Sequence, residues 1–291
     1  MFAAPWLVKC AAGAAILLIA CGFATAHFGS GLQMPATTTR DGTLITLSRY
    51  LREPVPDIVL VGSSITFRLK EEYFATPRLR NLALAGGSPV TGLEIIANQP
   101  RLPRLILVEV NVLARSSDAE LVERYSRGDT GPLLFRPVRA AVAAYEQRRH
   151  APVTHEQVAL NLRRLVEQPP SDFDSRIYAD RALQQFNAED PTDAARFNAN
   201  RIAELIRVLE KRGARVLLFE LPYSGPIESS RYAATIREII HAAFPDSQRW
   251  LPIEMDRGEL RWADGVHLDE RSAVLVTQAL ERALALARTV K

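Results

Sequence analysis

Cysteine is almost absent from this chain, and both of its cysteines, Cys10 and Cys21, lie close to the amino terminus. The remaining 270 residues, from position 22 to position 291, therefore contain no side chain that could form a disulfide bond or a thiolate metal site. This excludes a small disulfide-stabilised fold and a zinc site built on cysteine.

Concentrated positive charge is also missing. The chain has 36 Lys and Arg against 33 Asp and Glu, a formal net charge of +3, and its arginines are interleaved with acidic residues. Proteins that bind nucleic acid usually present a concentrated basic face. We therefore expect no nucleic-acid partner.

The length and composition exclude a largely disordered chain and a protein with a very small hydrophobic core. The chain has 291 residues, of which 47% are hydrophobic and 24% are charged. These are ordinary values for a globular protein, and the length allows one large core with a sizeable insertion.

The amino-terminal segment differs from the rest because it lacks charge after Lys9. From Cys10 to Ala26 it contains only small and apolar residues, which predicts a membrane anchor or signal over residues 1–28. Three alternatives are an uncleaved anchor, a cleaved signal, and a bacterial lipoprotein signal in which Cys21 of Leu18-Ile19-Ala20-Cys21 is lipidated. Each predicts a folded part outside the cytoplasm, in the periplasm or on the outer cell surface, after a linker at residues 29–50.

From position 51 onward, short apolar runs alternate with helical patterns. The predicted strands are Asp57 to Val61, Leu79 to Ala85, Leu105 to Val110, Arg215 to Leu221 and Trp250 to Met255. The predicted helices that follow the insertion are Thr192 to Arg212, Arg231 to Ala243 and Glu270 to Ala287. Such alternation is typical of an α/β domain whose parallel sheet is covered on both faces. We expect this domain to occupy residues 51–291.

The alternation lapses at about residues 114–191, which we interpret as a helical insertion. Helical patterns occur near Val138 to Arg149 and near His155 to Val166. Insertions of this kind usually lie over the carboxyl ends of the strands, where they shape a substrate groove. A purely structural role is the alternative.

Polar side chains occur where the predicted strands end. Ser64 follows the first strand, and Asp264 and His267 precede the last helix. A serine hydroxyl needs a base to remove its proton, and the base needs a carboxylate that fixes its tautomer. We therefore predict Ser64 as a nucleophile, His267 as its base and Asp264 as the orienting carboxylate. Asp269 is the better cap for the closing helix, which leaves Asp264 free.

An attacking serine produces an oxyanion, which needs hydrogen-bond donors already in place. Three candidates are the backbone N–H of Ser64, the backbone N–H of Gly86 after the second strand, and the side-chain amide of Asn111 after the third. Ser63 is the alternative nucleophile.

Four short blocks together resemble the SGNH (GDSL-like) hydrolase superfamily over roughly Asp57 to Ala287. The blocks are Gly62-Ser63-Ser64-Ile65-Thr66, Asn81-Leu82-Ala83-Leu84-Ala85-Gly86, Glu109-Val110-Asn111 and Asp264-Gly265-Val266-His267-Leu268. The resemblance implies a flavodoxin-like three-layer α/β/α sandwich, no metal, no cofactor, and hydrolysis or transfer of acyl esters.

The chain departs from the family pattern at three places. Ser63 stands where the family commonly has Asp, Ala83 where it often has Gly, and Asn111 lies between Val110 and Val112 in place of the usual Gly-x-Asn-Asp. None of these changes removes a catalytic group. Similar departures occur in the branch that modifies cell-surface polymers.

Three functions follow as hypotheses. The first is an extracytoplasmic esterase that acts on acyl esters of a carbohydrate or cell-surface polymer, with acetyl as the expected acyl group. The second is an O-acyltransferase for an exopolysaccharide or cell-wall polymer, which would receive its acyl group from a multispanning membrane partner. The third is a glycan-binding module without catalysis.

Overall fold

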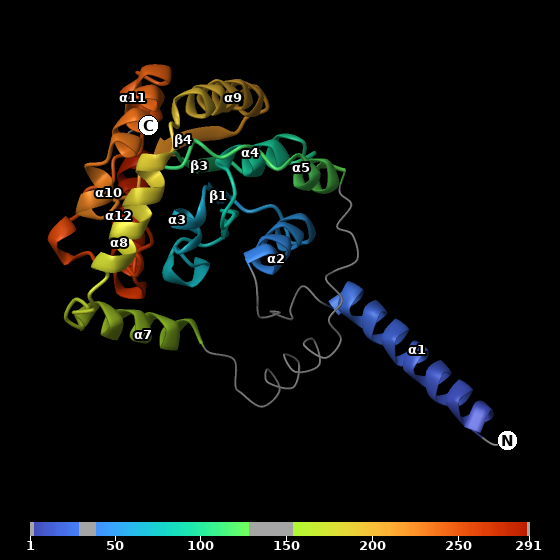
Figure 1. The fold of residues 1–291 in the computed structure, drawn as a ribbon. Helices are drawn as coiled ribbons and strands as arrows, with labels where there is room; N and C mark the ends of the chain where they lie inside the picture. The colour runs from blue at the N-terminus through green and yellow to red at the C-terminus, as the bar shows by residue number, and fades with distance from the viewer. Residues whose placement is uncertain (1–2, 29–38, 128–153, 290–291) are drawn as a thin grey trace.

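The computed structural model describes residues 3–28, 39–127 and 154–289, and its centre is a parallel sheet of four strands. The strands are β1 (Ile58–Val61), β2 (Leu79–Asn81), β3 (Leu105–Glu109) and β4 (Arg215–Phe219), in the order β2-β1-β3-β4. Helices surround this sheet (Figure 1). The predicted α/β class with a central parallel sheet is confirmed.

The strands are short apolar runs because both faces of the sheet are covered. All four residues of β1 are buried, and Ile58 pairs with Leu79 on one side and with Leu105 on the other. A near-continuous run of Val, Ile and Leu is typical of a parallel strand without a solvent face. Since the four strands run the same way, their carboxyl ends meet at one edge.

Alternate residues of β1, β3 and β4 belong to two separate hydrophobic clusters. Val59 and Val61 lie in one cluster, and Ile58 and Leu60 lie in the other. The first cluster is completed mainly by α2 (Thr39–Arg52), α4 (Pro89–Ala97), α5 (Ala119–Ser126), α9 (Thr192–Lys211) and α11 (Arg231–Ala243). The second is completed mainly by α3 (Ser64–Phe67), η2 (Glu71–Tyr73), α10 (Gly225–Glu228) and α12 (Glu270–Thr289).

The remaining described elements are α1 (Ala3–Phe28), α7 (His155–Glu167), α8 (Arg176–Ala188), η3 (Ser247–Arg249) and η4 (Arg257–Glu259). Of the predicted insertion at residues 114–191, the structure describes α5, α7 and α8. The helical pattern predicted over residues 138–149 lies outside the described residues.

Two predictions of local structure need correction. The strand expected over Trp250 to Met255 is reduced to one bridge between Trp250 and Leu218, at the open edge of the sheet. That segment contains Pro252, which has no N–H to donate and is typical of sheet edges. The linker expected at residues 29–50 contains most of α2, because Leu44, Leu47 and Leu51 recur at helical spacing and pack into the core. Residues 29–38 lie outside the described residues.

The amino-terminal segment forms α1, and Cys21 lies within it. Trp6, Ile16 and Ile19 on this helix are exposed. Among the described residues, no helix is both long enough and apolar enough to cross a membrane. Within residues 3–28, the structure therefore does not bear out the uncleaved spanning anchor, which was one of the three alternatives for this segment.

Candidate active site

A tight turn places Ser64 at the carboxyl edge of the sheet. β1 ends at Val61, and Ser64 begins α3 two residues after Gly62. The hydroxyl of Ser63 caps α3 by accepting a hydrogen bond from the N–H of Ile65 at 3.3 Å. A Cβ at Gly62 would lie only 2.8 Å from Thr66 Oγ1, so a larger residue would push the turn out of place.

Ser64, His267 and Asp264 form a continuous chain of hydrogen bonds. The Nε2 atom of His267 lies 2.8 Å from the Oγ of Ser64, although the two residues are 203 positions apart in the sequence. The Nδ1 atom of the same ring lies 2.7 Å from Oδ2 of Asp264. This geometry lets the imidazole accept the serine proton while the carboxylate holds the other ring nitrogen.

Asp264 also shapes the loop that carries His267. Its Oδ1 accepts hydrogen bonds from the N–H groups of His267 at 2.8 Å and Val266 at 3.2 Å. Burial opposes ionisation of this carboxyl, but the hydrogen bonds from His267 outweigh it and lower the pKa of Asp264 to about 2. Asp264 is therefore ionised at neutral pH, as a partner of a charged imidazole must be.

Gly265 fits this loop for two reasons. Its φ is +82°, a backbone conformation that residues other than glycine rarely adopt. A Cβ there would lie 2.6 Å from the Cα of Ala179 on α8. The loop is therefore packed directly against α8.

Asp269 caps the closing helix, as expected. Its Oδ1 accepts a hydrogen bond from the N–H of Ser272 at 2.7 Å. This contact supports the first turn of α12 without using Asp264.

The second block is fixed against the first by Asn81. Its Nδ2 donates to the carbonyls of Thr66 and Leu69 at 2.8 Å each, and its Oδ1 accepts from the N–H of Ala83 at 2.9 Å. Leu84 then donates to the carbonyl of Gly62 at 3.0 Å. These bonds bring the loop with Gly86 beside the nucleophile turn.

Gly86 lies in the cavity that also contains Ser64, Asp264 and His267. Its φ is +77°, which again favours glycine. Ser64 is the first residue of α3, a position at which the N–H has no acceptor within the helix.

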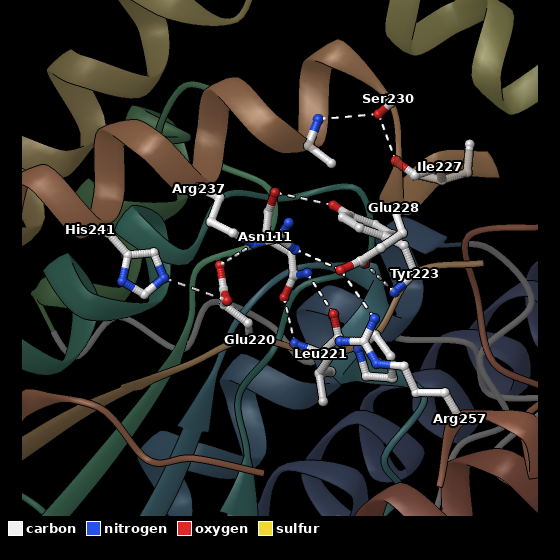
Figure 2. A network of polar contacts seen from close by, with 12 residues as sticks. Asn111, Glu220, Leu221, Tyr223, Ile227, Glu228, Ser230, Arg237, His241 and Arg257 are labelled. Carbon is white, nitrogen blue, oxygen red and sulfur yellow. Dashed lines mark hydrogen bonds and ion pairs between the residues drawn. The ribbon is translucent and has the colours of Figure 1, made fainter. Parts of the chain in front are cut away.

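Asn111 is placed differently from the prediction. Its side chain is paired in both directions with the backbone of Leu221, because Nδ2 donates to the carbonyl and Oδ1 accepts from the N–H, each at 2.7 Å. The backbone carbonyl of Asn111 accepts a hydrogen bond from the hydroxyl of Tyr223 at 3.1 Å (Figure 2). Asn111 is 4% exposed and is not among the described residues that line the cavity. The structure thus brings four of the five predicted site residues together and leaves Asn111 outside.

Glu109 is a buried carboxyl directly behind the nucleophile turn. It is fully buried at the end of β3 and accepts hydrogen bonds from the N–H of Ser63 at 2.8 Å, the hydroxyl of Ser63 at 2.7 Å and the N–H of Asn111 at 2.6 Å. Burial raises the pKa of Glu109, and these hydrogen bonds oppose that rise. Because the hydroxyl of Ser63 is buried and donates to Glu109, Ser64 is the better nucleophile.

The role of Glu109 was missed at the level of the sequence. A signal was present, since an acidic residue that ends an otherwise apolar run of Leu, Ile and Val must find donors if the run is buried. Which donors it finds depends on the register of β1 and β3, which a single sequence does not give.

A cavity of about 690 Å³ lies over the serine. Its lining combines residues of the loops at the edge of the sheet with residues of one face of α8. The lining residues that α8 contributes are Tyr178, Arg181, Ala182, Gln185 and Phe186, and Glu189 follows directly after the helix. α8 belongs to the segment predicted as an insertion over the strand ends.

No metal site was found among the described residues, where no cluster of three or more His, Cys, Asp or Glu side chains could hold an ion. No family model matches the chain, and no curated protein matches it either. The all-parallel α/β fold is compatible with the SGNH resemblance drawn from the four sequence blocks.

Proposed function

We propose that this protein is a serine-dependent ester hydrolase of the SGNH type, with a three-layer α/β/α fold. It removes acyl groups from esters, and acetyl is the acyl group that we expect. The single observation that carries the proposal is the hydrogen-bonded chain of Ser64, His267 and Asp264 at the carboxyl edge of the sheet. Ligands of open α/β sheets gather at this edge.

In the first half of the reaction, Ser64 Oγ attacks the ester carbonyl carbon while His267 Nε2 takes the hydroxyl proton. Asp264 stabilises the imidazolium that forms. The C–O bond of the ester then breaks, the alcohol leaves with the proton from His267, and the acyl group remains on Ser64. In the second half, His267 removes a proton from water, which attacks the acyl-serine and releases the free acid.

The N–H groups of Ser64 and Gly86 are the proposed donors to the oxyanion. Both residues line the cavity, whereas the amide of Asn111 is engaged with Leu221. The proposal therefore uses two donors and assigns Asn111 a structural role.

A second candidate is transfer of the acyl group to a sugar hydroxyl in place of water. The cavity contains the aromatic side chains of Tyr178, Phe186 and Tyr232. Aromatic faces with nearby polar groups suit the mixed apolar and polar surface of a sugar ring. Comparing acetate release with acetylation of added oligosaccharide separates the two activities.

Export from the cytoplasm is part of the same proposal. It is supported by the exposed apolar side chains of α1, which include Trp6, Leu7 and Phe23. The mass of the mature protein decides between a cleaved signal and a lipid on Cys21.

The test is labelling of the full chain with a fluorophosphonate probe, followed by mass spectrometry. We expect one adduct, on Ser64. Ser64→Ala should abolish it and lower hydrolysis of 4-nitrophenyl acetate by about 10⁴-fold or more. Ser116→Ala is the matched control, because Ser116 lines the same cavity and has no role in the proposed chemistry. A folded protein that is not labelled at Ser64 would exclude both enzymatic functions and leave glycan binding without catalysis.

A further inference from the structure

The lining of the cavity includes two arginines. Arg115 and Arg181 both line it, together with Ser64 and His267. Among the described residues, neither guanidinium forms a hydrogen bond or an ion pair. Other arginines are paired, as Arg80 is with Glu53 and Glu71. Within the part of the chain that the structure describes, neither cation has a partner that a ligand would have to displace.

Arg115 lies next to the proposed oxyanion donors. It follows β3, and its Nη1 would be 3.8 Å from a Cβ built on Gly86. Arg115 also acts on Tyr232, which lines the same cavity. Burial and the charge of Glu189 raise the pKa of Tyr232 to about 12, and the charge of Arg115 opposes that rise. A negative group bound by Arg115 would thus lie close to the scissile ester.

Arg181 comes from α8, three residues after Tyr178, and both residues line the cavity. Tyr178 is 47% exposed, and its ring lies 6.1 Å from that of Phe173 in a stacked arrangement. An aromatic face beside a guanidinium can bind a ring that carries an acidic substituent, because the ring packs on the aromatic group while the acid meets the cation.

The acidic residues of the cavity do not cancel this charge. The carboxylate of Asp264 is committed to His267. Glu189 is the other acidic residue of the described lining. The described lining therefore holds two cations that have no partner among the described residues, and one carboxylate besides that of Asp264.

We propose that the substrate carries a fixed negative charge close to the ester, as an acylated acidic glycan does, and that Arg115 and Arg181 bind it. This inference rests on the proposed function, because it assumes that the ester occupies this cavity. The planar guanidinium matches carboxylate, sulfate and phosphate groups through paired hydrogen bonds.

The experiment measures binding separately from turnover. In the full chain carrying Ser64→Ala, calorimetry compares oligogalacturonate with its neutral methyl ester and with a sulfated oligosaccharide of similar length. We expect the acidic glycan to bind more tightly than the methyl ester, and the sulfated arm shows which anion is preferred. Arg115→Gln and Arg181→Gln should each weaken acidic binding by roughly tenfold.

Arg104→Gln is the matched control. Arg104 is an exposed arginine just before β3, at the end of the sheet away from the cavity. Equal binding of the acid and its methyl ester, or equal effects of the Arg104 and Arg115 variants, would overturn the inference. If the wild-type chain hydrolyses 4-nitrophenyl acetate but shows no such preference, the proposed function stands and this inference fails. If binding is selective but Ser64 of the wild-type chain is unreactive, the two arginines bind an acidic glycan, but the proposed function fails and with it the claim that this glycan is a substrate.

Discussion

The nucleophile turn is held by the sheet beneath it, whereas the loop that carries the base is held mainly by bonds within itself. Ser63 donates both its N–H and its hydroxyl to Glu109, which lies 46 positions later at the end of β3. In the base loop, Asp264 binds the backbone and ring of His267, only three positions away. The contact of that loop with the rest of the protein includes the close approach of Gly265 to Ala179.

This difference separates two kinds of positioning. The base loop is a local motif whose geometry follows from its own residues. The nucleophile turn depends on a buried carboxyl that pairs with two loops at once, because Glu109 also binds the N–H of Asn111. A substitution in the base loop should therefore impair proton transfer by His267. A substitution at Glu109 should displace the turn that carries Ser64.

The largest effect is expected for Asp264→Asn. An amide at this position can donate to Nδ1 of His267 and so favour the tautomer that cannot accept the proton of Ser64. We expect kcat for 4-nitrophenyl acetate to fall by about 10⁴-fold in a protein that remains folded. A decrease of less than about tenfold would show that Asp264 only shapes the loop.

The acid stability of the same variant provides the control. The pKa of Asp264 is lowered from 3.8 to about 2, so its bonds stabilise the folded state above about pH 4 and lose that effect as pH falls toward 2. The difference in unfolding free energy between wild type and Asp264→Asn should shrink over this range. A difference independent of pH would contradict the assigned bonds.

A smaller decrease in kcat is expected for Glu109→Gln, which tests how the sheet positions the nucleophile turn. The side-chain amide of the introduced Gln has an NH₂ group where Glu109 has an acceptor oxygen. This group would face N–H or O–H donors of Ser63 or Asn111, so we expect the nucleophile turn to shift. We expect kcat to fall by about 10²-fold with little change in KM, and the unfolding free energy to fall by about 1–3 kcal/mol.

Labelling at Ser64 by the fluorophosphonate should slow in parallel with kcat in this variant. Glu210→Gln is the matched control, because Glu210 pairs with Arg249 away from the cavity. If Glu109 were only structural, both variants would lower the melting temperature while leaving kcat and the labelling rate unchanged.

Features that depend on contiguous residues could be predicted from the sequence. The helix at Arg231–Ala243 and the cores of the four strands follow from local apolar patterns. Ser64, Asp264 and His267 could be placed together because parallel strands bring their carboxyl ends to one edge.

Features that depend on register or on the direction of a side chain could not be predicted. The pairing of Glu109 with Ser63 requires β1 and β3 to be aligned as observed. The face of α8 that lines the cavity is set by its packing, including the contact of Ala179 with Gly265. Asn111 follows β3 as expected, but its side chain turns toward Leu221 because that backbone N–H and carbonyl need partners.

The smallest effect on catalysis is therefore expected for Asn111→Ser. Loss of an oxyanion donor typically lowers kcat by about 10²–10³-fold, whereas loss of the bonds to Leu221 should lower the unfolding free energy by about 1–3 kcal/mol. We expect the second result, with kcat changed by less than about tenfold because the oxyanion donors stay in place. Urea unfolding and turnover measured on the same preparations decide between them. If turnover instead slowed by about 10²-fold while stability stayed unchanged, Asn111 would have to be assigned as an oxyanion donor. Its side chain would then have to leave Leu221 when substrate binds.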